Sequence, residues 1–165
     1  MTTSDPTTPD PTMAAITEAV TTGRSGDTVA ARVRLETLWE EIGPEGDALH
    51  RCALAHFLAD LYDDATISLT WDARALEAAD SLDDTRVQQE HASLQIRGFY
   101  PSLHLNLADD HRRLGNFDAA TEHLTAARIY LDALADDGYG ATVRSGIDNV
   151  TRALAERSTE RLVTH

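Results

Sequence analysis

Apolar side chains recur along this chain at intervals of three and four residues, the spacing of one face of an α-helix. The clearest case lies near the C-terminus, where Val143, Ile147, Val150 and Leu154 follow one another at intervals of four, three and four. Gly, Pro and paired Asp residues separate such stretches and are typical of helix ends and starts. The pattern therefore predicts an all-α fold.

The breaks divide the chain into helix pairs. The first pair lies within residues 12–42, the second consists of 47–62 and 65–82, and the third lies within 101–134. A last helix covers 141–156. Asp27 is predicted to cap the second helix, and Gly43-Pro44 to end it. Residues 83–100 are predicted as an extra helix or as an N-terminal extension of the next one, with Gly98 and Pro101 kinking or breaking it.

One stretch carries a more specific signal. Residues 106–127 read NLADDHRRLGNFDAATEHLTAA, the end of one helix, a tight Gly-Asn turn and a second helix with small side chains at Ala120 and Ala127. This resembles the tetratricopeptide repeat, a helix-turn-helix unit of about 34 residues. Residues 26–38 resemble the turn and second helix of the same unit. The second pair departs from the pattern, with Asp63 where the turn Gly is expected and Ser68 where Ala is usual.

The resemblance implies a right-handed superhelix of about three helix pairs with a C-terminal capping helix, whose inner groove binds other chains. The helical domain is expected over residues 12–157. Residues 1–11, rich in Thr, Pro and Asp, are expected to be a disordered tail, and residues 158–165 a fraying C-terminal tail.

Composition agrees with helices. The chain has 25 Ala and 19 Leu against 7 Val and 6 Ile, and the first two lead the helix scale. Its one cysteine, Cys52, excludes an internal disulfide and fits a reducing cytoplasm. No apolar run approaches the roughly 20 residues of a membrane span, and the N-terminus does not read as a secretory signal. We therefore expect a cytoplasmic protein that does not contact membranes.

Charge narrows the class of partner. The 28 acidic residues outnumber 14 basic ones, all Arg, and give a net charge of −14. Such a surface repels phosphate backbones, so direct nucleic-acid binding is not expected, whereas a basic protein or peptide partner would be attracted. Solubility, codon composition or salt adaptation account for the same charge, and the sequence does not separate these explanations.

In the repeat family, the first helix of each pair faces the groove, where a matching Asn often bonds a bound peptide. The resemblance, together with the expected outward positions, gives seven partner-binding residues: Asn106, Asp109, Arg112, Arg113, His50, Phe57 and Asp60. Ser102 and Leu105 are expected to point outward with them. The alternative is structural: Asn106 bridges helices and Arg113 pairs with a neighbouring Asp.

A catalytic or metal-binding role has weaker support. Cys52, His56 and Asp60 share one helix face, and His104 and His111 share another, so two packed helices could form a zinc site. Such spacing is unspecific, and no C-x-x-C, H-E-x-x-H, G-x-S-x-G or phosphate loop occurs. We predict a non-enzymatic interaction module without cofactor or metal. The alternatives are an assembly subunit that self-associates as a homodimer through residues 83–100 and exposed Trp or Phe side chains, and a His/Cys metal sensor or enzyme.

Overall fold

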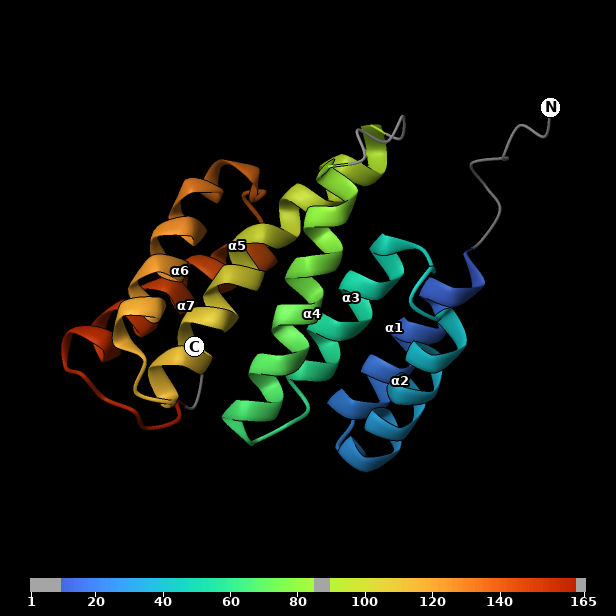
Figure 1. Cartoon of the computed structure of the whole chain (residues 1–165), viewed down its shortest axis with the longest axis horizontal. Helices are drawn as coiled ribbons and strands as arrows, with labels where there is room; N and C mark the ends of the chain where they lie inside the picture. Colours follow the sequence, from blue (N-terminus) through green and yellow to red (C-terminus); the bar gives the residue numbers. More distant parts are fainter. Residues whose placement is uncertain (1–9, 85–89, 163–165) are drawn as a thin grey trace.

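A computed structural model describes residues 10–84 and 90–162, and side chains from 83 to 96 lie outside that description. Over these residues the chain forms seven α-helices and one short 3-10 turn, with no strand (Figure 1). The prediction of an all-α fold is confirmed. In the part described, none of the helices combines the length and apolar character needed to cross a bilayer.

Helix bounds follow the breaks in the sequence. The elements are α1 (Pro11–Arg24), α2 (Thr28–Ile42), α3 (Ala48–Ala59), α4 (Ala65–Asp84), α5 (Glu90–Arg113), α6 (Phe117–Ile129), the 3-10 turn η1 (Leu131–Ala133) and α7 (Gly138–Ala155). At the start of five helices, an aspartate carboxylate accepts a hydrogen bond from a backbone N–H. These residues are Asp10, Asp27, Asp47, Asp64 and Asp137. Each satisfies a donor that the first helical turn leaves free. The predicted cap at Asp27 is confirmed, and α2 ends at Ile42, before Gly43-Pro44.

Successive helices pack as hairpins. Short turns join α1 to α2, α3 to α4 and α5 to α6, so the two helices of each pair lie antiparallel, and α7 packs against α5 and α6 (Figure 1). The core has two parts. One joins α1 to α5 around Ile16, Leu35, Leu54 and Leu58, and the other joins α5, α6 and α7 around Leu124.

Helix α5 corrects one prediction. It continues without interruption through Gly98 and Pro101, so a break there is wrong, and the segment before Pro101 extends the helix toward its N-terminus. Proline removes one N–H and leaves one carbonyl of the preceding turn unpaired. Tyr100 and Leu103 are buried on either side of Pro101, and this packing holds the helix across the defect. Residues 85–89, part of the predicted insertion, lie outside the described residues.

Val29 and Val33 share the helical spacing of the apolar residues that follow them, yet both are exposed, because the buried face of α2 is Ala31, Leu35 and Leu38. Residues 158–162, part of the segment expected to fray, return to the ends of α3 and α5, where the Ser158 carbonyl accepts a hydrogen bond from Arg112. Residues 1–9 and 163–165 lie outside the described residues.

Candidate functional site

Helices α3 and α5 lie side by side and run in the same direction. Ser102 Oγ lies 3.0 Å from His56 Nε2, one turn later Asn106 Nδ2 lies 3.3 Å from Asp60 Oδ1, and at the far end Arg113 donates to the Asp63 carbonyl. The partners of the first two contacts are both 46 residues apart in sequence, so the two helices are in register in that part of the α3–α5 seam, and Asp63 lies in the turn after α3.

An open groove of about 790 Å³ lies at the N-terminal end of the seam. Four parts of the chain form it: the start of α1, the start of α3, the middle of α5, and the segment from η1 into α7. Its lining residues are Asp10, Met13, Leu49, Gly98, Phe99, Ala133, Leu134, Ala135, Asp137 and Tyr139.

The groove combines apolar walls with acidic groups. Met13, Leu49 and Phe99 pack only partly into the core, and Tyr139 is 49% exposed. The acidic groups are Asp10 and Asp137, which are held in place because they cap α1 and α7. A groove of this kind suits an apolar side chain that has a basic neighbour.

The middle of the seam is a buried polar network. His56 Nε2 contacts Ser102, and His56 Nδ1 lies 3.5 Å from Asn106 Nδ2 and 3.7 Å from Asp72 Oδ1. Burial lowers the pKa of His56, against the opposing effect of Asp60. A neutral imidazole with its proton on Nε2 donates to Ser102 and accepts from Asn106, which satisfies both ring nitrogens.

Two carboxyl groups meet beside this network. Asp72 on α4 and Asp110 on α5 are both almost fully buried. The pKa of Asp110 is raised to about 9, mainly by burial and secondly by the neighbouring Asp72. Burial also raises the pKa of Asp72 well above its usual value. At neutral pH the pair therefore holds a proton, because two buried carboxylates cannot both ionise cheaply.

Arg112 lies on the face of α5 that is turned toward the protein interior. Its side chain is 0% exposed, and its Nε and Nη2 lie 3.0 and 2.6 Å from the same oxygen, Asp109 Oδ1. Nη1 donates to the Ser158 carbonyl at 2.7 Å. The ion pair with Asp109 fixes the Arg112 side chain, and its hydrogen bond to Ser158 holds the returning tail against α5.

Of the seven residues predicted to bind a partner, four lie together, Arg112 pairs with one of these four, Asp109, and two lie elsewhere. Asn106, Asp109 and Asp60 meet at the far end of the α3–α5 seam, with Arg113 beside them. His50 lies at the other end, where its Nε2 is 2.6 Å from Asp10 Oδ2 beside the groove, and Phe57 packs against the core. The structure thus brings four of the seven together.

Their expected exposure is partly wrong. Asn106, Asp109 and Arg112 are buried, as are Ser102 and Leu105, because α5 is covered on several sides by α3, α4, α6 and α7. The residues that sequence reasoning missed are Met13, Leu49, Phe99 and Tyr139, which come from four separate elements. Met13 and Leu49 lie on predicted first helices, the helices that the repeat turns toward its groove, whereas Tyr139 lies between predicted helices.

The tryptophans also differ from expectation. Trp39 and Trp71 form an edge-to-face pair with ring centroids 5.2 Å apart, and Arg51 and Arg74 cover them. Trp71 is buried and Trp39 is partly buried, so neither is a fully exposed Trp side chain of the kind expected for self-association.

The histidines proposed as metal ligands have other neighbours. His56 lies in the α3–α5 network, and His104 and His111 turn toward His123 on α6. Burial raises the pKa of Cys52 to about 12, so this thiol stays protonated at neutral pH. No set of three His, Cys, Asp or Glu residues in the described chain is placed to hold a metal ion.

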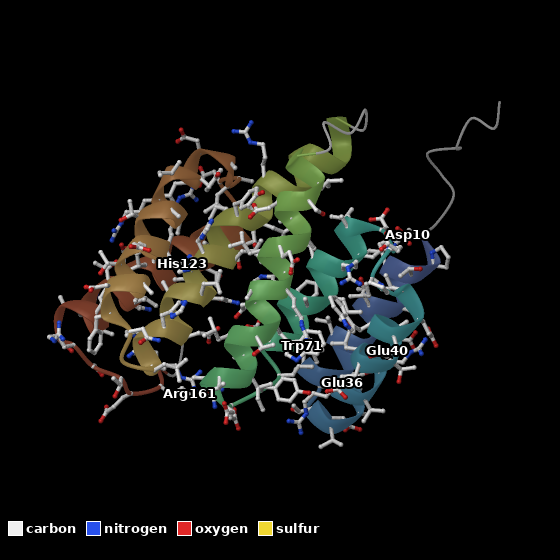
Figure 2. All side chains as sticks on the ribbon, in the orientation of Figure 1. Asp10, Glu36, Glu40, Trp71, His123 and Arg161 are labelled. Carbon is white, nitrogen blue, oxygen red and sulfur yellow. The ribbon has the colours of Figure 1, made fainter. Side chains whose placement is uncertain are left out.

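His104, His123 and His111 form a stack between α5 and α6 (His123 is labelled in Figure 2). The Nδ1 atoms of His104 and His123 lie 3.1 Å apart, and the rings of His111 and His123 are nearly parallel. The pKa of His104 is lowered to about 4, mainly by burial and secondly by His123. Burial also lowers the pKa of His111 and of His123. The folded protein therefore favours three neutral rings.

Acid should weaken this stack. Because the folded pKa values lie below the usual 6.5, the unfolded chain takes up protons first, and stability falls as pH drops from about 6.5 toward 4. With allowance for solvent screening of partly exposed rings, the loss is on the order of 2 kcal/mol. We expect His123→Gln, which removes the central ring, to halve this loss in urea unfolding at pH 7 and pH 4.5. An unchanged difference between the two pH values would show that the stack does not titrate.

A search of family models, of curated proteins and of solved structures finds no match to this chain.

Proposed function

We propose that this protein is a non-catalytic interaction module that binds a segment of a partner protein in the groove between α1, α3, α5 and α7. The observation that carries the proposal is the open groove of about 790 Å³ lined by Met13, Leu49, Phe99 and Tyr139. Its place on the first helices of successive pairs is where a tetratricopeptide-like superhelix holds its ligand, so the arrangement supports that interpretation of the fold. A cytoplasmic setting accords with Cys52 and remains part of the proposal.

The groove also indicates the chemistry of the partner. Apolar walls favour one or two aliphatic or aromatic side chains, and Asp10 and Asp137 favour basic residues beside them. The net charge of −14 adds long-range attraction for the same kind of segment. We therefore propose a basic, apolar peptide as the occupant.

A random peptide display library tests this directly. Peptides selected on the protein should share an apolar residue close to Arg or Lys. Tyr139→Arg removes an aromatic wall and adds a repelling charge, so selected peptides should bind it at least about tenfold more weakly. The matched control is Ile129→Arg, at a 70% exposed position on α6 outside the groove, which should bind normally. Equal affinity for both variants, measured by fluorescence anisotropy, would reject the groove as the binding site.

A further inference from the structure

Gly98 lies inside helix α5 and on the wall of the groove. Apart from proline, glycine is the least favourable residue in a helix interior, because it loses the most conformational freedom when it becomes helical. A glycine at such a position is useful where another group must come close to the helix backbone.

The fold itself does not use the space at Gly98. Apart from the adjoining helix backbone, no atom of the described residues lies within 4 Å of the position that a Cβ would take there, and the backbone is not left-handed. Gly140 differs, because a Cβ at that position would clash with the Ala135 carbonyl oxygen, so the fold requires glycine. The space that the missing side chain leaves at Gly98 therefore opens into the groove without serving the packing of the chain.

A second glycine beside the groove is open in the same way. Gly138, the first residue of α7, lies between the lining residues Asp137 and Tyr139. A Cβ there would also meet no atom within 4 Å among the described residues. Two of the elements that form the groove, α5 and the start of α7, thus expose main chain without a side chain beside it.

Bare main chain in a groove suits an extended segment better than a helix. The side chains of a helix surround its main chain and give it a diameter of about 10–12 Å, so that the main chain stays away from any surface on which the helix lies. Side chains of an extended segment point alternately to two opposite sides. Its main chain can therefore lie directly on a surface where the protein has no side chain.

We propose that the partner segment binds in an extended conformation with its main chain against Gly98. Its apolar side chains then contact Leu49 and Phe99, and its basic side chains face Asp10 and Asp137. The inference rests on the proposed function, and it adds the conformation of the partner segment and the residue of the groove that selects it.

The direct probe is a synthetic peptide, acetyl-Arg-Leu-Gly-Leu-Arg-amide, which places apolar side chains next to basic ones. NMR on the isotopically labelled full chain should show nuclear Overhauser effects between the Hα protons of Gly98 and main-chain protons of the peptide. Within the bound peptide, strong effects from each Hα to the next N–H identify an extended chain, whereas strong effects between successive N–H groups identify a helix.

Two substitutions fill the opening by different amounts. Alanine and leucine both favour helices, so Gly98→Ala and Gly98→Leu should each raise the Tm by about 2–4 °C. The peptide should nevertheless bind Gly98→Ala about threefold more weakly and Gly98→Leu at least about tenfold more weakly, because the added groups occupy the place of its main chain. The control Ala30→Leu enlarges an exposed side chain on α2 outside the groove and should leave the affinity unchanged. A gain in stability together with a loss of affinity cannot arise from damage to the fold.

The outcomes separate this inference from the proposed function. The inference is overturned if the peptide binds in the groove as a helix, if Gly98 contacts only its side chains, or if Gly98→Leu binds it as tightly as the unmodified protein or more tightly. An equal loss of affinity in Ala30→Leu overturns it as well. In each of these cases the groove remains the binding site as long as Tyr139→Arg weakens binding. A peptide that perturbs no groove residue rejects both proposals.

Discussion

Replacing Arg112 with methionine is expected to destabilise the protein by about 3–5 kcal/mol, the usual cost of removing one partner of a buried ion pair. Arg112 is fully buried and supplies both hydrogen bonds to Asp109 Oδ1 as well as the bond to the Ser158 carbonyl. Methionine fills much of the space but leaves a buried carboxylate and a carbonyl without donors. In thermal unfolding this corresponds to a fall in Tm of about 10 °C or more for a chain of this size.

Two further variants separate the charge from the packing. Arg113→Met changes the next residue, which is only partly buried and contacts a backbone carbonyl, so it should cost less than about 1 kcal/mol. The double variant Arg112→Met with Asp109→Leu removes both charges and should recover most of the lost stability, since apolar replacement of a buried pair is often nearly neutral. If the double variant is as unstable as Arg112→Met alone, lost packing and not the stranded charge is the cause.

The sequence predicted the helices well because their ends depend on local chemistry. Asp27 and Gly43-Pro44 set the bounds of α2 through a side-chain cap and a missing N–H, and both effects involve only near neighbours. Pro101 failed as a breaker because its effect depends on tertiary packing, which no local pattern contains.

The site was predicted less completely. Arg112 was assigned to the groove face together with Leu105, from the register expected for a first helix of the repeat, and the structure buries both. Which face of α5 is covered depends on the helices that pack on it, and no local pattern contains that information. The return of the tail to α5 depends on contacts 46 residues apart, between Arg112 and Ser158, and had no signal in the sequence. The groove likewise joins α1, α3, α5 and α7, so its residues could not be grouped before the fold was known.

Replacing Asp110 with asparagine is expected to stabilise the protein at neutral and alkaline pH. The pKa of Asp110 rises from 3.8 when unfolded to about 9 when folded, because the carboxyl is buried and lies beside Asp72. The folded protein keeps a proton that the unfolded chain releases. The stability contributed by Asp110 is therefore fully present below pH 4 and is lost steadily as pH rises toward 9. Asparagine does not titrate, and its amide donates to Asp72 at every pH.

The size of the gain should depend on pH in a way that identifies its cause. One pKa unit corresponds to about 1.4 kcal/mol, and pH 8 lies about four units above the unfolded pKa of 3.8, so Asp110→Asn should raise the free energy of unfolding by up to about 6 kcal/mol at pH 8 but by only about 1 kcal/mol at pH 4.5. Urea unfolding of Asp110→Asn and of the exposed control Asp148→Asn at both pH values measures this directly. An equal gain at both pH values, or the same gain in the control, would mean that the two carboxyl groups do not share a proton.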